Sequence, residues 1–263
     1  MPSPIRLAEA KRTMVSTSNG SGRQFLDTTR AEFMAPSDQM LGLPQPLLEL
    51  PYEGGAVHAL ADPAGFDVPA LDLWEAIVRR ESAREYSSEP LTLAELSYLL
   101  FATQGVRAVV QGEYSLRTVP SAGARHAFET YLLVNRVEGL EPGLYRYLAL
   151  DHRLLEVDLD PAVGGRIVAA CYGQPFLQTA AAIFVWTAVP YRMTWRYGER
   201  GYRYLFLDAG HVCQNLYLAA EPIDCGVCAI GAFDDDALDR AIGADRSDQF
   251  PIYVATVGKL AAR

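Results

Sequence analysis

Hydrophobic residues recur at helical and strand spacings from about residue 69 to the end of the chain. An apolar stripe over residues 71–78 predicts a helix that ends at the arginine pair 79–80. The sequence Thr92-Leu93-Ala94-Glu95 has the form of a capping box, so a second helix is predicted from there to about residue 103. The first two regular elements are therefore helices.

Strands and helices follow in the middle and at the end of the chain. Apolar runs bounded by turn residues predict strands over 132–134, 144–147, 154–159, 181–186 and 252–257. The first three are joined by short connections, so we expect them to pair locally and antiparallel. The run at 181–186 is continuously apolar, as is typical of a central strand covered on both faces. Helices are predicted over about 161–171 and 204–221, the second largely buried.

Residues 1–68 differ from the rest of the chain. They hold seven prolines and a Ser/Gly stretch at 16–22, a mixture that breaks helices and strands alike. We therefore divide the chain into an irregular N-terminal extension, residues 1–68, which wraps the surface, and a single domain, residues 69–263. The order of helices and strands in that domain predicts the α+β class.

Composition is that of a compact globular protein. Of the 263 residues, 50% are hydrophobic and 21% are charged, and the formal net charge is −9. An acidic chain repels polyanions at long range, which argues against a general nucleic-acid or anionic-membrane surface. No apolar run approaches the roughly 20 residues that cross a bilayer. The first residues lack the apolar core of a secretory signal, so we expect a cytoplasmic location with reduced cysteines.

An arginine-rich segment follows the first predicted helix. Arg79, Arg80 and Arg84 lie within six positions, with Ser82 between them. Guanidinium forks match phosphate oxygens, so the segment is a candidate phosphate site. The alternative, equally compatible with this segment alone, is a surface salt-bridge cluster with the neighbouring carboxylates of Glu75, Glu81 and Glu85.

Two later segments bear on this choice. Pro120-Ser121-Ala122-Gly123-Ala124 is a turn of small residues, which lets a backbone approach a flat ring closely. Residues 196–204 alternate arginines and tyrosines around two glycines, and Arg196 and Tyr197 are candidates for contact with a substrate. The polar residues that follow in the long helix, His211, Gln214 and Asn215, are interpreted as core groups with satisfied hydrogen bonds.

Cys225-Gly226-Val227-Cys228 has the spacing of half a zinc or redox site. The neighbouring residues are apolar and no second cysteine pair exists, so we interpret the segment as a buried strand and expect no metal. The sequence also lacks G-x-G-x-x-G after a strand, G-x-x-x-x-G-K-[ST], H-E-x-x-H and G-x-S-x-G. Rossmann, nucleotide-triphosphatase, zincin and α/β-hydrolase interpretations lose their main support.

Seven segments occur in a fixed order along the chain: RRESAREY, LTLAELSYLLFATQGV, RTVPSAGARHAFETYLLV, GLYRYLALDHRLLEV, RYGERGYRYLFLDAGHVCQNLYLAA, IGAFDDD and YVATVGK. This ordered set resembles the nitroreductase family and, within it, the SagB-type dehydrogenase branch. The resemblance covers about residues 71–259. It implies a nitroreductase-like α+β fold, with a central mixed β-sheet flanked by helices, and FMN held noncovalently between the subunits of an intertwined homodimer.

The resemblance also implies which residues contact the cofactor. By this resemblance the phosphate and ribityl chain bind to the arginine-rich segment, at Arg80, Glu81, Ser82 and Arg84. The small-residue turn, at Pro120, Ser121 and Ala122, lies against the isoalloxazine, usually that of the partner subunit. The ring edge near N5 falls to Ile230, Gly231 and Ala232, and Lys259 is a looser match near the phosphate.

The implied activity is hydride transfer between flavin N5 and a small or peptide-borne substrate, with azoline or other heterocycle oxidation as one form. Members that oxidise azolines often carry Lys-Tyr where this chain has Arg196-Tyr197. Arginine stays protonated and is a poor general base, which leaves Tyr197 as the proton-transfer group. Two alternatives stay open: a reductase of nitro compounds or quinones with NAD(P)H as electron donor, and a flavin-free binding scaffold.

Overall fold

The computed structural model describes residues 20–244 and 247–261, and its centre is a seven-stranded sheet with the order β1-β6-β5-β4-β7-β9-β8. The strands are β1 Val57–Ala59, β4 Phe128–Val134, β5 Gly143–Leu148, β6 Arg153–Asp158, β7 Ala182–Ala188, β8 Cys225–Ile230 and β9 Phe250–Lys259. The α+β class is therefore confirmed. Strand β7 is buried along its whole length, as its continuous apolar run predicts.

The sheet is antiparallel rather than mixed. Every pairing between neighbouring strands of the seven is antiparallel, and the three strands β4, β5 and β6 are joined by short connections that permit no other arrangement. Parallel pairing is confined, in the described residues, to two isolated bridges, Ser82 with Val227 and Leu91 with Val137. The first of these lays the arginine-rich segment along the edge strand β8.

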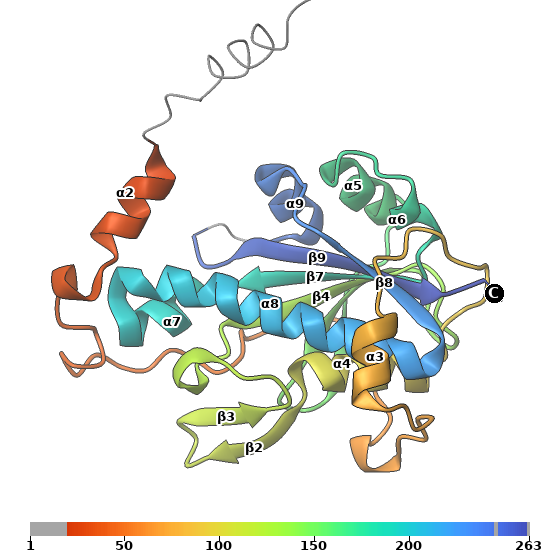
Figure 1. Cartoon of the computed structure of the whole chain (residues 1–263), viewed down its shortest axis with the longest axis horizontal. Helices are drawn as coiled ribbons and strands as arrows, with labels where there is room; N and C mark the ends of the chain where they lie inside the picture. The colour runs from red at the N-terminus through yellow and green to blue at the C-terminus, as the bar shows by residue number, and fades with distance from the viewer. Residues whose placement is uncertain (1–19, 245–246, 262–263) are drawn as a thin grey trace, which may run out of the picture.

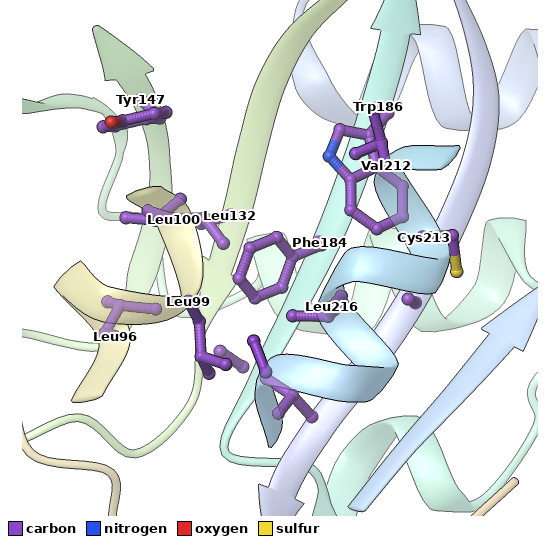
Figure 2. Packing of buried hydrophobic residues seen from close by; sticks show 14 of the residues in the cluster. Leu96, Leu99, Leu100, Leu132, Tyr147, Phe184, Trp186, Val212, Cys213 and Leu216 are labelled. Carbon is purple, nitrogen blue, oxygen red and sulfur yellow. The ribbon is translucent and has the colours of Figure 1, made fainter. Parts of the chain in front are cut away.

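Helices cover both faces of the sheet (Figure 1). One face carries α4 Leu93–Gln104 and α8 Gly201–Ala220, and the other carries α5 Val163–Ala170, α6 Phe176–Thr179 and α9 Asp235–Ile242. Figure 2 shows leucines of α4 and the Val212 to Leu216 turn of α8 meeting over Phe184 and Trp186 of β7. Within the described part of the chain, no helix has the length and apolar character needed to cross a membrane.

Shorter elements complete the fold. They are the helices α2 Ser21–Thr28, α3 Leu73–Arg79 and α7 Pro190–Tyr197, the hairpin β2 Val106–Val110 with β3 Tyr114–Arg117, and the 3₁₀ turns η1 Ala31–Phe33, η2 Pro63–Gly65, η3 Ala122–Ala124, η4 Gly198–Arg200 and η5 Glu221–Ile223. The capping box at the start of α4 is confirmed, because the Glu95 amide donates to Thr92 Oγ1 (3.1 Å) and the Thr92 amide donates to Glu95 Oε2 (2.9 Å).

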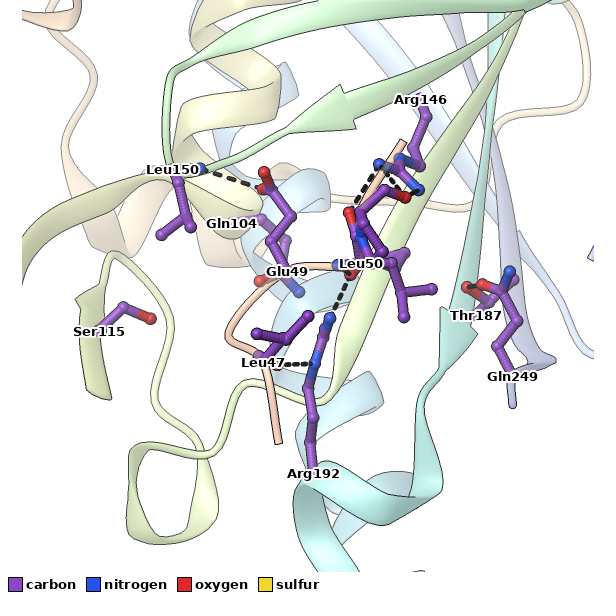
Figure 3. A network of polar contacts seen from close by, with 12 residues as sticks. Leu47, Glu49, Leu50, Gln104, Ser115, Arg146, Leu150, Thr187, Arg192 and Gln249 are labelled. Carbon is purple, nitrogen blue, oxygen red and sulfur yellow. Dashed lines mark hydrogen bonds and ion pairs between the residues drawn. The ribbon is translucent and has the colours of Figure 1, made fainter. Parts of the chain in front are cut away.

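A buried polar network fixes part of the N-terminal segment to the domain (Figure 3). Arg192 of α7 and Glu129 of β4 form an ion pair of 2.6 Å, with only 2% of either side chain exposed. The same carboxylate accepts the Leu50 amide (2.9 Å), and Arg192 Nε donates to the Leu47 carbonyl (2.8 Å). These bonds, with the pairing of β1 to β6, attach residues 47–59 to the sheet. A domain boundary at residue 68 stays a prediction.

Two helices leave apolar side chains uncovered in the single chain. The stripe that predicts α3 is largely exposed, with Trp74 at 72%, and only Ala76 of this helix is buried. In α8 the core positions are buried as predicted, but Phe206 (59%) and Leu207 (60%) are exposed on the opposite side. α3 lies against the C-terminal half of α8 (Figure 1). The exposed apolar side chains therefore belong to α8 and to α3, a helix that packs against α8.

Candidate functional site

The arginine-rich segment begins where α3 ends. Asp72 caps this helix by accepting the amides of Trp74 and Glu75, and the chain then runs extended beside β8. The Ala83 amide donates to the Val227 carbonyl (2.9 Å), which anchors the segment to the sheet edge. Side chains alternate along extended backbone, so Arg80, Ser82 and Arg84 fall on one side of the segment and Glu81 on the other.

The arginines of this segment differ in their partners. Arg79 pairs with Glu75 (3.0 Å) and approaches Glu221 (3.6 Å). Arg80 lies over the ring of Tyr217, 5.2 Å from its centroid, and Arg84 lies 6.0 Å from the ring centroid of Phe176. Within residues 20–244 and 247–261, neither Arg80 nor Arg84 forms an ion pair. The salt-bridge interpretation thus applies to Arg79, and two guanidinium groups remain for an anion.

Tyr217 of α8 joins this segment to the end of β8. Its hydroxyl lies 3.0 Å from Ser82 Oγ and accepts the Ala229 amide at 2.9 Å. The structure therefore brings the 80–84 segment together with Ile230, Gly231 and Ala232. A Cβ added at Gly231 would meet nothing within 4 Å, so this backbone is open to a neighbour. Tyr217 was not predicted as a site residue. The feature that could have indicated it is a hydroxyl near the end of an apolar helix.

Glu81 and Lys259 are directed elsewhere. Glu81 lines a cavity of about 510 Å³ with Arg79, Glu89 and Glu221, an acidic environment that does not suit a phosphate. The Lys259 ammonium binds the Glu95 carboxylate (2.5 Å) and the Ile223 carbonyl (2.8 Å). The lysine charge is already compensated by that carboxylate.

The small-residue turn is held by Asp208, a second residue of α8. Both of its carboxylate oxygens lie 3.3 Å from the Ala122 amide nitrogen, and it also hydrogen-bonds the Ser121 side chain. Burial raises the pKa of Asp208, and these two hydrogen bonds oppose the increase. The turn is thus fixed, with Pro120 exposed beside it. Sequence analysis assigned Asp208 no role, although an acid within a buried apolar helix is a signal.

Arg196 and Tyr197, at the end of α7, lie against the same turn. Gly123 has a φ of +58°, and a Cβ there would fall 2.5 Å from the Tyr197 hydroxyl and 3.0 Å from Arg196 Nε. The Tyr197 ring also packs edge-on to Tyr204 with centroids 4.8 Å apart. The structure therefore brings the turn and the Arg-Tyr pair together, which their separation in sequence does not reveal.

We expect Gly123→Ala to lower the free energy of unfolding by about 1–3 kcal/mol, because a left-handed residue with a Cβ is strained and this Cβ also meets the Tyr197 hydroxyl. Gly112→Ala is the matched control, since Gly112 has a φ of +76° but nothing within 4 Å of the added atom. Urea denaturation measures both. Equal losses in the two variants would show that the Tyr197 contact has no energetic weight.

The two groups of residues lie on opposite sides of α8. Asp208, which holds the turn, and Tyr217, which holds the arginine-rich segment, are nine positions apart. Nine residues of α-helix correspond to about 180° of rotation and about 14 Å along the axis. The turn is therefore held near the middle of α8, and the arginine-rich segment contacts its last turn.

The interpretation of the cysteine pair as part of a buried strand is confirmed by β8. Cys225 and Cys228 are three positions apart, so alternation directs them to opposite faces of the strand. Burial raises the pKa of the Cys225 thiol to about 12, which keeps it protonated. In the described ranges no group of three or more His, Cys, Asp or Glu side chains is placed to hold a metal ion.

The three polar residues of α8 have different environments. Asn215 donates to the Ala102 carbonyl at 2.9 Å, as a satisfied core residue does. The same interpretation is wrong for His211 and Gln214, which are exposed on the face of α8 that carries Phe206 and Leu207. The helical repeat places both residues on the exposed face of α8, away from the buried positions that pack on the sheet.

Comparison with known proteins identifies the fold. A model of the nitroreductase family matches residues 77–259. A protein of Methanocaldococcus jannaschii named as a nitroreductase is 37% identical over 193 residues, which cover 73% of this chain and 93% of that protein. The trifolitoxin-processing protein TfxB of Rhizobium leguminosarum is 32% identical over 145 residues, covering 52% of this chain and 38% of its own length.

Two solved structures show the same architecture. A nitroreductase structure from Anabaena variabilis matches with a TM-score of 0.62 and 33% identity, over 72% of this chain and 38% of that one. A nitroreductase from Desulfovibrio desulfuricans, solved in complex with FMN, matches with a TM-score of 0.53 and 17% identity, over 73% and 88% of the two chains.

An antiparallel sheet between two helical layers defines an α+β protein. The chain belongs to the nitroreductase family and is an oxidoreductase by that membership.

Proposed function

We propose that this protein is an FMN-dependent oxidoreductase of the SagB type. When bound, the flavin supplies the redox chemistry by exchanging a hydride at N5 with a small or peptide-borne substrate. The single observation that carries the proposal is the pair Arg80 and Arg84, two guanidinium groups on one sheet edge without an ion-pair partner in the described residues. The FMN complex of a family member with the same fold supports it.

The residues along β8 and the arginine-rich segment fit such a ligand. Arg80, Ser82 and Arg84 present two cations and a hydroxyl to a phosphate. The Gly231 backbone has no neighbour within 4 Å of a built Cβ, so a ring can approach it. Tyr217 and Asp208 orient the two segments without themselves reaching the solvent face. Glu81 and Lys259 contribute less, because their side chains are engaged elsewhere.

We further propose that two copies of the chain complete each site. Asp208, which holds the turn, and Tyr217, which holds the arginine-rich segment, lie about 14 Å apart along α8 and on opposite sides of it, so we assign the two contacts of one ligand to different subunits. The exposed apolar side chains of α3 and α8 supply the surface for this contact. A homodimer of intertwined subunits follows.

In this arrangement Arg196 and Tyr197 face the substrate side of the ring. Arg196 keeps its charge and stabilises an anion, while the Tyr197 hydroxyl is the group able to move a proton. The likeness to the trifolitoxin-processing protein supports the peptide-borne form of the proposed substrate. The likeness to a protein named as a nitroreductase favours the second candidate, an NAD(P)H-dependent reductase of nitro compounds or quinones.

The visible spectrum tests the proposal. We expect the purified protein, after incubation with FMN and removal of free ligand, to show a bound-flavin spectrum. Rapid anaerobic bleaching by NADH or NADPH would favour the reductase, and no bleaching would favour the dehydrogenase. A preparation that takes up no FMN would refute both and leave a flavin-free binding scaffold.

A further inference from the structure

A second arginine shares the turn with Arg196. Arg125 is only 5% exposed, and its guanidinium stacks over Trp195 with 5.3 Å between the charge centre and the ring centroid. Its Nε donates to the Gly123 carbonyl (3.3 Å) and its Nη2 to the Glu113 carbonyl (3.4 Å). Arg196 Nε lies beside the same glycine, 3.0 Å from the position that a Cβ added at Gly123 would take. Two cations therefore flank one glycine.

The charge of this pair is not compensated nearby. The bonds that Arg125 forms are long and go to neutral carbonyls, and in the described part of the chain neither Arg125 nor Arg196 has a carboxylate within ion-pair distance. The buried Arg192, by contrast, has Glu129 at 2.6 Å. Burial and then the nearby Arg196 charge lower the pKa of Arg125, while Tyr197 and Glu113 oppose the decrease.

Arg125 is the buried member of the pair, and Arg196 is exposed. A buried cation beside a like charge is unfavourable unless an anion joins it. The chain as a whole has a net charge of −9, so two arginines without a carboxylate partner differ from the acidic character of the rest of the protein. We propose that Arg125 and Arg196 form a subsite for the carboxylate of a flat substrate, and this proposal rests on the proposed flavin function. The substrate class is then a planar or heterocyclic carboxylic acid. A peptide-derived ring with a free carboxylate belongs to this class.

The surroundings select this chemistry. The exposed Arg196 guanidinium can bind a carboxylate with two parallel hydrogen bonds, which fixes the orientation of the attached ring, while Arg125 adds a second positive charge. Trp195, Tyr197 and Tyr204 add aromatic surface at the same place. A substrate that exchanges a hydride must lie flat on the flavin, and an anchored carboxylate holds it there. Glu113 is the acidic group that opposes this anion, and its side chain is exposed.

The test compares two matched probes, benzoate and benzamide, which differ in charge but little in shape. Each is titrated into the FMN-loaded protein while the flavin difference spectrum is recorded. We expect benzoate to bind at least about tenfold more tightly than benzamide, a ratio typical of one desolvated charge pair. Arg196→Gln should remove most of the preference, Arg196→Lys should retain part of it, and Arg153→Gln, an exposed arginine of β6, should change nothing.

Arg125→Gln is a second variant with the same expected loss, and Arg196→Gln keeps the proposal testable if the buried substitution unfolds the protein. Equal affinities for the two probes, no binding of benzoate, or an unchanged preference in Arg196→Gln would overturn the subsite. A shift of the flavin reduction potential in Arg196→Gln with unchanged benzoate binding would assign Arg196 to the flavin instead. FMN uptake is measured separately, so failure of the subsite is distinct from failure of the proposed function.

Discussion

Replacing both Arg80 and Arg84 by alanine is expected to weaken FMN binding by about two to four orders of magnitude. Hydrogen bonds to charged groups contribute about 1.5–3 kcal/mol each, and about 1.4 kcal/mol corresponds to a tenfold change in Kd. Neither arginine forms an ion pair in the described residues, so their loss leaves no buried carboxylate unpaired. The fold should therefore survive, and the effect should appear in ligand affinity.

Arg79→Ala is the matched control. This arginine belongs to the same segment and its substitution removes one positive charge, against two in the double variant, but its guanidinium is already bound to Glu75. Flavin fluorescence titrations of the apo-protein give Kd for each variant, and circular dichroism confirms folding. If Arg79→Ala weakens binding as much as the double substitution, the segment acts only through its overall charge. If the double variant binds as the parent does, the phosphate lies elsewhere.

Local patterns were sufficient to predict most of the regular elements. The capping box at Thr92, the continuous apolar run of β7 and the buried strand containing Cys225 depend on neighbours in sequence, and each has its predicted form. The helices α2, α6, α7 and α9, the strand β1 and the hairpin β2-β3 were not predicted. α7 starts with a proline and is polar on average, and the hairpin is exposed along most of β2.

The candidate site was predicted in pieces but not in its arrangement. The arginine-rich segment, the small-residue turn and the Arg-Tyr pair were recognised, because each concentrates unusual residues within a short stretch. Asp208 and Tyr217 were not, since each is one polar residue in an apolar helix and acts on a segment at least 86 positions away. Such contacts follow from the packing of α8, which no local pattern encodes.

The exposed apolar surface is the feature that sequence analysis interpreted least well. The stripe at residues 71–78 indicated a helix correctly, and an apolar helix face normally packs on its own core. In the single chain the face of α3 that holds Trp74 is instead exposed. α3 lies beside the C-terminal half of α8. A periodicity reports that a surface will be buried, and not which chain buries it.

Trp74→Glu combined with Phe206→Glu is therefore expected to convert a dimer into a monomer. Each aromatic side chain offers on the order of 150–250 Å² for burial, and a carboxylate in its place must be desolvated without a partner. Both side chains are more than half exposed in the single chain, so the substitutions cost the isolated fold little. Light scattering after size-exclusion chromatography measures the molecular mass.

The same double variant should also lose its flavin, because the arginine-rich segment of one copy and the turn of the other no longer meet. Tyr172→Glu is the control, an exposed aromatic residue after α5 on the opposite helical layer, and it should keep both mass and flavin content. A monomeric variant that retains FMN would place the whole site within one chain. A variant that stays dimeric would assign the contact to another surface, because a pair of glutamates cannot remain buried at a two-fold apolar interface without partners.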